Sequence, residues 1–328
     1  MRELFSDRPV LLEGEDIDGG SSPFRNWRLE AVHLGRGTTA HSAVVLPVDR
    51  TRMTLVQVRR PTVLRGSSPD NELSLLTTSP SSPPVRIGSR PLSGGVCLML
   101  GARAQVEIYL PDNCCAFMLS LPSSGANGAN APLHASAAPP SGRAEFRALA
   151  PEHGALLSRC MDLLETFRRS SSPDLVAPQV QRRLRELLMP AAGCLFSKSM
   201  AVAGESREGL TRREAVARAC AYIDKHLNEA ITLDDLCTVA GVRARTLEYG
   251  FRKCYEVGPV AYLRSIRLCH VRRDLLTARR VASVAKAARR WRFTHMGQFS
   301  RDYRLLFGES PSNTLARSRG RVAQVSAP

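Results

Sequence analysis

The C-terminal third of the chain contains one pattern of residues twice, and this repeat restricts the fold more than any other feature. The first copy consists of Leu233, Leu236, Ala240, Gly241, Val242, Leu247, Phe251, Tyr255, Pro259 and Leu263. The second copy consists of Val284, Ala287, Trp291, Arg292, Phe293, Phe299, Tyr303, Phe307, Pro311 and Leu315. The copies are 51 residues apart before their turn and 52 residues apart after it, so the second turn has one additional residue. Apolar residues at helical spacing on both sides of a short turn predict two helix-turn-helix units.

The segments around the two units also have helical patterns. A helix is expected over 213–228, before the first unit. Thr232 and Asp235 resemble a capping box, which would start the next helix at Leu233. A longer helix from Pro259 to about residue 278 would join the units, since proline is tolerated in a first helical turn. At about 1.5 Å per residue it would span roughly 30 Å. Successive major grooves on one face of B-DNA are about 34 Å apart, so two recognition helices could enter adjacent grooves.

The first recognition helix is expected over 244–255, with Leu247 and Phe251 facing the core. The residues expected to face outward are Arg243, at the start of the helix, Arg245, Glu248, Tyr249 and Arg252. Arginine suits the paired acceptors of guanine, and glutamate can accept from the amino group of cytosine. A solvated helix face would contain the same residue types. Because the motif fixes which face points outward, base contacts are predicted for Arg245, Glu248 and Tyr249.

The second recognition helix is expected to start near His295 and to end at Phe307. Its outward residues would be His295, Met296, Gln298 and Arg301. Glutamine can pair with adenine, and methionine can touch a thymine methyl group. Arg301 or Arg304 could equally hold phosphate, which positions a protein without specifying sequence. A lone histidine at a helix start is also a common surface or capping residue. Four arginines of the joining helix are assigned either to phosphate or to intramolecular contacts: Arg264, Arg267, Arg272 and Arg273.

Positive charge is concentrated around the repeat. Residues 211–320 contain 22 Lys and Arg against 10 Asp and Glu, a net charge of +12 out of the +16 of the whole chain. Such an excess is typical of a surface that binds a polyanion. An arginine-rich solvated surface would produce the same count, so charge alone does not decide between the two. Together with the repeat, it favours binding to double-stranded DNA.

The cysteines and the apolar segments indicate the compartment. The nine cysteines include no C-x-x-C pair, which favours free thiols in a reducing environment over a disulfide framework. The first residues show no basic start followed by an apolar run, so no signal peptide is predicted. The longest apolar stretches, such as 96–100, are too short to span a bilayer. A cytoplasmic protein with no membrane partner is therefore expected.

The N-terminal part has the pattern of a β domain followed by helices. Alternating or apolar segments at 53–58, 96–100, 106–110 and 116–121 are separated by turn residues and predict an antiparallel barrel or sandwich. Residues 122–142 are rich in Pro, Gly, Ser and Ala and are expected to form a loop. Helical patterns follow at about 144–169 and 176–195. The polar segment 197–209 is expected to be a linker.

Residues 213–318 resemble the paired helix-turn-helix domain of AraC/XylS-type transcription regulators. The segments that carry the resemblance are Ile231–Val242, Arg245–Phe251, Tyr262–Leu268, Trp291–Tyr303 and Leu306–Ser312. Three residues depart from a typical pattern. Arg292 stands where the family usually has glycine, and Ala287 where a larger aliphatic residue is usual. Gly250 lies inside a recognition helix, where glycine costs about 1 kcal/mol relative to alanine. If the second turn needs a positive φ, Arg292 costs a similar amount.

The resemblance implies an α+β chain with an effector-sensing and dimerisation domain over 1–195, often a cupin-like antiparallel β-barrel followed by helices. A linker over 196–212, the DNA-binding domain over 213–318 and a tail over 319–328 would complete it. Only His33 and His41 precede residue 130, without the ligand spacing of a cupin metal site, so no metal and no cofactor are expected. Barrels of this size commonly hold one small ligand.

The leading hypothesis is a sequence-specific transcription regulator controlled by a small-molecule effector. It would act as a homodimer formed by the residues before 196, with the helix at 176–195 as a candidate for the interface, and it would work with RNA polymerase. Whether it activates or represses transcription is left open. One alternative is a DNA-binding protein without sequence preference, which would not need Glu248 or Gln298. Another is an enzyme with an appended DNA-binding module, but the chain has no G-x-S-x-G, no phosphate-binding glycine loop and no paired histidines of a metal site.

Overall fold

In the computed structural model the chain divides into two compact units. One takes Met1–Ala31, Ala40–Arg59 and Leu64–Gly204, and the other takes Glu205–Pro328 with the short segments Val32–Thr39 and Arg60–Val63. The structure describes residues 10–14, 23–24, 26–37, 40–48, 51–92, 95–122, 141–170, 207–277 and 283–325, with the single positions 179, 182 and 186. None of the described helices is long and apolar enough to cross a membrane.

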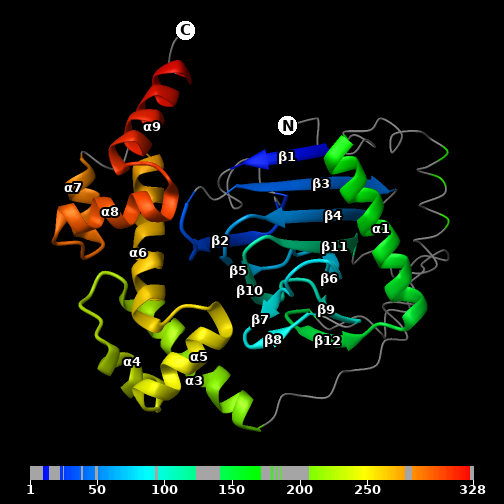
Figure 1. Cartoon of the computed structure of the whole chain (residues 1–328), viewed down its shortest axis with the longest axis horizontal. Helices are drawn as coiled ribbons and strands as arrows, with labels where there is room; N and C mark the ends of the chain where they lie inside the picture. The colour runs from blue at the N-terminus through cyan, green and yellow to red at the C-terminus, as the bar shows by residue number, and fades with distance from the viewer. Residues whose placement is uncertain are drawn as a thin grey trace. The chain divides into compact units, whose positions relative to one another are not determined.

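The N-terminal part contains two β-sheets (Figure 1). The first has seven strands in the order β1 (Val10–Gly14), β3 (His41–Val48), β4 (Thr51–Val58), β11 (Cys114–Pro122), β6 (Glu72–Thr78), β9 (Val96–Leu100) and β12 (Ala144–Ala148). Each neighbouring pair in this sheet is antiparallel. The second has five strands in the order β2 (Arg28–His33), β5 (Thr62–Ser67), β10 (Gln105–Leu110), β7 (Arg86–Ile87) and β8 (Arg90–Pro91).

The central strands of the seven-stranded sheet are buried on both faces. In β4, Met53 and Leu55 belong to an apolar cluster that includes Leu157 and Leu164 of helix α1 (Pro151–Ser170). Val56 belongs to a second cluster, which includes residues of the five-stranded sheet. The central strands therefore lie between a helix and a second sheet, which explains why their apolar runs are nearly continuous. The expected antiparallel β domain is confirmed. The described strands do not close into a barrel, because β1 and β12 end the first sheet without pairing to each other.

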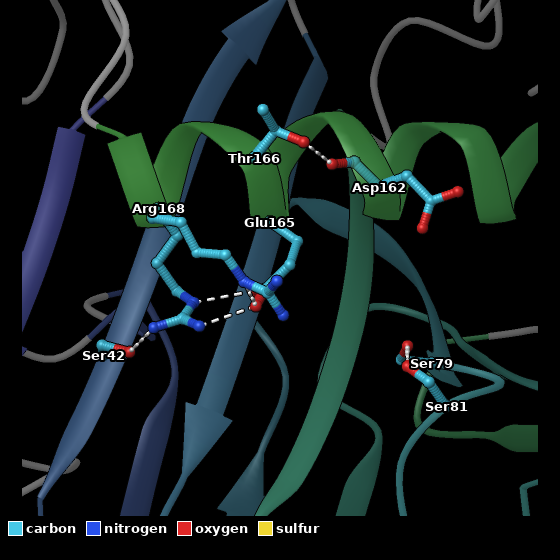
Figure 2. A network of polar contacts seen from close by, with 8 residues as sticks. Ser42, Ser79, Ser81, Asp162, Glu165, Thr166 and Arg168 are labelled. Atoms are coloured by element: carbon cyan, nitrogen blue, oxygen red, sulfur yellow. Dashed lines mark hydrogen bonds and ion pairs between the residues drawn. The ribbon is translucent and has the colours of Figure 1, made fainter.

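A polar contact holds α1 against the sheet (Figure 2). The Arg168 guanidinium donates to both carboxylate oxygens of Glu165, at 2.7 and 2.8 Å, and to Ser42 Oγ of β3 at 3.4 Å. These hydrogen bonds from Arg168 lower the pKa of Glu165 below its ordinary value. The pair satisfies two charged groups at the edge of an apolar interface, so α1 can pack closely on β3.

One expectation for the N-terminal part needs correction, and three others concern residues that the structure does not describe. The expected helix over 144–169 begins only at Pro151, and Ala144–Ala148 forms β12 instead. This strand pairs with β9, whose open edge offers backbone partners that local helical spacing cannot reveal. The expected loop at 122–142, the helix at 176–195 and the linker before residue 207 lie almost entirely outside the described residues.

The C-terminal part is helical and contains the expected repeat. Its helices are α3 (Arg207–His226), α4 (Leu233–Ala240), α5 (Ala244–Tyr255), α6 (Pro259–Leu276), α7 (Val284–Arg290), α8 (Met296–Phe307) and α9 (Pro311–Val325). The two predicted units, α4 with α5 and α7 with α8, are confirmed. Helix α3 begins before the expected Arg213, within the segment expected to be linker, and α9 continues to Val325, into the segment expected to be a tail.

Each unit is built around an aromatic cluster that includes its recognition helix. In the first, Phe251 and Tyr255 of α5 pack with Tyr262 of α6, whose ring centroid lies 5.4 and 4.7 Å from theirs. In the second, Phe299, Tyr303 and Phe307 of α8 form a buried series. Their burial explains the apolar residues shared by the two sequence copies.

Helix α6 is anchored to the second unit by a buried arginine. Arg272 is only 3% exposed, and its guanidinium donates to Glu309 at 2.7 Å while lying 4.7 Å from the centroid of the Phe307 ring. Asp274 of the same helix accepts from the Trp291 indole at 2.8 Å. Truncating one partner of such a buried pair is costly because the other charge stays unpaired. The role of Arg272 left open by the sequence is therefore an intramolecular contact.

The ends of α4 follow the sequence signals. The Thr232 backbone N–H donates to Asp235 at 2.8 Å, and the Asp235 N–H donates to Thr232 Oγ1 at 3.2 Å, which confirms the capping box. The backbone N–H of Thr232 holds the pKa of Asp235 below its ordinary value. At the other end Gly241 adopts φ 68° and closes the helix with a left-handed residue.

The turn of the second unit repeats this geometry with an arginine. Arg292 has φ 68°, the same value as Gly241. In both turns the left-handed residue and the one after it donate backbone N–H groups to the preceding helix. The acceptors are the Thr238 and Cys237 carbonyls in the first turn and the Arg289 and Ala288 carbonyls in the second. The second turn therefore does require a positive φ at Arg292. A residue with a Cβ atom in this conformation destabilises the fold by about 1 kcal/mol or more relative to glycine. The additional residue of the second copy lies after Arg292, before the N-cap His295.

Gly250 has a packing role that the sequence did not indicate. A Cβ atom at this position would lie 2.8 Å from Cγ2 of Val216 on α3. Glycine therefore lets α3 approach α5 closely, and this contact offsets the low helix propensity of glycine.

Replacing Gly250 with alanine should lower the free energy of unfolding by about 1–3 kcal/mol, because the stiff Val216 side chain cannot move away. Adding Val216→Ala should recover part of that loss. The matched control is Gly297→Ala in the other recognition helix, where a Cβ meets nothing within 4 Å. This change should be neutral or stabilising by up to about 1 kcal/mol. Urea unfolding of the four proteins tests the contact, and a more stable Gly250→Ala variant would contradict it.

Replacing Arg292 with glycine should raise the free energy of unfolding by about 1 kcal/mol, because glycine adopts a positive φ without strain. Arg292→Ala removes the same charge but keeps a Cβ, so it should give no comparable gain. Denaturant unfolding at two salt concentrations separates the two causes. An equal gain in both variants would assign the effect to charge rather than to the backbone.

Candidate nucleic-acid interface

The first recognition helix presents the expected residues on one face. Arg243 is the N-cap of α5 and makes no capping bond with its side chain. Arg245 is exposed, Tyr249 is 52% exposed and the Arg252 side chain is 70% exposed. Glu248 is partly buried, and its carboxylate lies 3.9 Å from the Arg252 guanidinium. The opposite face is buried through Leu247 and Phe251, as the spacing predicts. That this face contacts DNA stays a prediction.

Helix α3 supports this face in a way that the sequence did not indicate. The Arg212 guanidinium lies 5.2 Å from the centroid of the Tyr249 ring. A cation over an aromatic face is attracted by the electron density of the ring. The contact restricts the orientation of Tyr249 beside Arg245 and Arg252.

The second recognition helix is also oriented as expected. His295 is the exposed N-cap of α8, and its side chain makes no capping hydrogen bond, so the capping role considered for it is not observed. Gln298 and Arg301 are exposed, whereas Met296 is half-buried and offers only part of its side chain. The Gln298 amide donates to Asp302 Oδ1 at 2.9 Å. Asp302 was not among the residues singled out from the sequence, because only the fold brings it beside a cation.

Two further arginines of α6 have intramolecular partners. Arg267 donates to the carbonyl oxygens of Leu227 at 3.1 Å and Glu229 at 2.6 Å, just after the end of α3. Burial, and to a smaller extent the charge of Arg292, lowers the pKa of Arg267. Arg264 forms an ion pair with Asp302 of α8. Arg273 is half-buried on the same helix.

The remaining cations of the recognition helices differ from those of α6. Within the described part of the chain, the side chains of Arg243, Arg245 and Arg301 make no hydrogen bond or ion pair. Exposed guanidinium groups without an internal partner can bind phosphate or the acceptor edge of guanine without breaking an existing contact. The surface of α5 and α8 is therefore chemically suited to a polyanion.

The described cysteine and metal-ligand residues do not suggest another site. Burial raises the pKa of Cys115 to about 11 and that of Cys97 to about 12, and it also raises the pKa of Cys114. Thiols held protonated in this way are poor nucleophiles, which speaks against redox sensing by the adjacent Cys114 and Cys115. No group of three or more His, Cys, Asp or Glu side chains that could hold a metal occurs in the described ranges.

Comparisons with known proteins agree with this geometry. A family described as a helix-turn-helix domain matches residues 236–317. A probable thc operon regulatory protein of Rhodococcus erythropolis is 35% identical over 101 residues, which are 30% of this chain and 30% of that protein. The XylDLEGF operon transcriptional activator 2 of Pseudomonas putida is 31% identical over 113 residues, 34% of this chain and 72% of that protein.

A solved structure, a probable AraC family transcriptional regulator from Rhodopseudomonas palustris, is 33% identical and covers 32% of this chain and 96% of that one, with a TM-score of 0.31. A longer relative, the XylDLEGF operon transcriptional activator of Pseudomonas putida, is 32% identical over 136 residues. The chain spans only 30% of the Rhodococcus protein and 42% of this activator.

The matched segment begins within α4 and contains the rest of both helix-turn-helix units and the helix between them. The activator 2 relative is matched over most of its own length at an identity above 30%. With the repeated turn geometry and the paired recognition helices, these similarities show that the chain belongs to the AraC/XylS family of transcription regulators.

Proposed function

We propose that the protein is a sequence-specific regulator whose α5 and α8 read two adjacent major grooves of double-stranded DNA. The observation that carries this proposal is the pair of exposed helix faces, each with unpaired arginine and polar side chains at its N-terminal half. Helix α6 joins the two units with 18 residues, or about 27 Å at 1.5 Å per residue. This length approaches the spacing of about 34 Å between successive major grooves on one face.

Each exposed residue is assigned a role by its chemistry. Arg245 suits the two acceptors of guanine, Glu248 the amino group of cytosine and Gln298 adenine. Arg243, Arg252, Arg301 and Arg304 suit phosphate, which sets register. Tyr249, His295 and the accessible part of Met296 complete the surface, with Met296 suited to a thymine methyl group. The protein would act in the cytoplasm with RNA polymerase, as a homodimer formed through residues 1–195.

The alternative is a DNA-binding protein without sequence preference. Such a protein requires cations but gains nothing from Glu248, because a carboxylate near phosphate is repelled. Glu248 on the exposed face of α5 therefore favours base reading. The two hypotheses differ in the ratio of affinities for selected and random DNA at one salt concentration.

The proposal is tested by in vitro selection of DNA bound by the full chain at a stated salt concentration. The expected motif has two short boxes about one helical turn apart, roughly 10 base pairs between centres. A motif with one box would mean that one of the two units contacts only the DNA backbone and reads no bases. Random DNA bound as tightly as any selected sequence would overturn the proposal.

Arg245→Ala, tested on the selected DNA, should lose about 1–3 kcal/mol of binding free energy and relax the base preference at one position. The matched control is Arg301→Ala, which should lower the affinity for all DNA sequences by the same factor and reduce the dependence of affinity on salt. A uniform loss for Arg245→Ala would reassign that residue to phosphate.

We also propose that the N-terminal domain binds a small-molecule effector. A cavity in this domain suits an uncharged effector. It measures about 360 Å³, within the range of about 300–1,000 Å³ of ligand sites. It lies between the end of β6 and α1, with Thr77, Ser79 and Ser158 beside Leu92, Leu157 and Met161. The described lining contains no charged side chain, so it suits a neutral ligand with an apolar body and a few hydrogen-bonding groups. The cupin-like form of this domain remains part of the proposal.

Nile red, an uncharged dye whose emission rises in apolar surroundings, serves as the probe for this cavity. The full chain should bind it, and Ser158→Trp should abolish the emission by filling the space. Leu163→Trp adds similar bulk at a position of α1 that is 43% exposed and outside the lining, and it should leave binding unchanged. Equal emission from both variants would exclude this cavity as the binding site.

A further inference from the structure

Three side chains at the surface of α8 form a connected network. Asp302 Oδ1 accepts from the Gln298 amide at 2.9 Å, and Asp302 Oδ2 pairs with the Arg264 guanidinium of α6. Gln298 and Asp302 are four residues apart on α8, so they lie on one helix face. The Asp302 side chain is only 17% exposed, whereas that of Arg264 is 46% exposed. Both oxygens of Asp302 therefore have donors within the protein.

This network decides which end of the Gln298 amide faces Asp302. An ionised carboxylate only accepts hydrogen bonds, so it must meet the NH₂ end of the amide and not the oxygen. An unrestrained glutamine can rotate its amide by half a turn and present either end. With the NH₂ end bound to Asp302, the carbonyl oxygen and one amide hydrogen remain for another partner.

The remaining pair of groups distinguishes two bases. In the major groove adenine offers the N7 acceptor and the N6 amino donor, whereas guanine offers only the acceptors N7 and O6. A carbonyl oxygen beside one N–H matches adenine. A rotated amide, with both hydrogens toward the groove, would match guanine. The orientation of the Gln298 amide therefore determines the base that the second recognition helix accepts.

The first unit has no equivalent of this network among its described residues. With the offset of 52 residues, the position matching Asp302 is Gly250, where α3 packs closely through Val216. Its Glu248 carboxylate and Arg252 guanidinium lie 3.9 Å apart, too far for a hydrogen bond that fixes a rotamer. In this unit an arginine of α3, Arg212, lies over the Tyr249 ring instead. Among the described residues, a carboxylate that fixes the amide of a recognition-helix side chain therefore occurs only in the second unit.

We propose that Asp302 is a positioning residue that gives the second recognition helix its preference for adenine, by fixing the Gln298 amide without touching DNA. This inference rests on the proposed function, since it requires that α8 reads bases. Arg264 supports it by occupying the second oxygen of Asp302 and holding the carboxylate in place.

The test compares four full-length proteins on DNA that differs only at the base assigned to Gln298: the wild type, Gln298→Ala, Asp302→Asn and the double variant. Asparagine has the same shape but can donate or accept, so both amide orientations become satisfied. Asp302→Asn should reduce the affinity ratio of adenine over guanine by at least about fivefold, because a bidentate contact accounts for most of that ratio. In the Gln298→Ala background, Asp302→Asn should change the ratio no further.

Each comparison is repeated in an Arg264→Met background, so an arginine released from Asp302 cannot be the cause of a changed preference. Thermal unfolding and affinity for random DNA record any general effect on folding or charge. An unchanged ratio in Asp302→Asn, while Gln298→Ala alters it, overturns the inference and leaves the proposed function intact. A wild type with no preference at any base of the second box refutes base reading by α8, and with it the inference. A change that persists without Gln298 would mean that Asp302 acts directly on the DNA, which also overturns positioning.

Discussion

Each recognition helix buries an aromatic ring, Phe251 on α5 and Phe299 on α8, and the proposed DNA-binding surface depends on this burial. The Phe251 ring packs with Tyr255 and Tyr262, and the Phe299 ring packs with Phe293 and Tyr303. Truncating a buried aromatic side chain costs about 3–5 kcal/mol, so the helices cannot rotate about their axes at small cost. The face opposite the aromatic stripe is consequently held outward, with Arg245 on α5 and Gln298 on α8.

The arginines of the C-terminal part serve two different purposes. Arg267 and Arg272 are directed inward, onto the carbonyls after α3 and onto Glu309, and Arg264 joins α6 to α8. These groups stabilise the relation between helices and are already paired. Arg243, Arg245 and Arg301 have no such partner within the described ranges. Net charge therefore overstates the number of cations open to DNA, and the contacts of each guanidinium are the better guide.

In the N-terminal part, the apolar pattern of the strands is determined by tertiary packing on both faces of the sheet. Residues of β4 enter one apolar cluster or the other according to their side of the sheet, because α1 covers one face and the second sheet the other. Strands buried on both faces lose the clean alternation of a half-exposed sheet. The same apolar segments are compatible with a barrel or with stacked sheets, so local pattern does not determine how the strands close.

The sequence by itself determined the repeat, the bounds of α5, the capping box at Thr232 and the outward face of both recognition helices. These features depend on contacts within a few residues or on the 3.6-residue period, which a sequence displays directly. Only the tertiary structure decided that Ala144–Ala148 is a strand, that Gly250 serves close packing on Val216, and that Arg272 is buried on Glu309. It also placed Asp302 between Gln298 and Arg264. Each of these outcomes depends on a partner distant in the chain or on a neighbouring helix, and no local spacing encodes the distance between such groups.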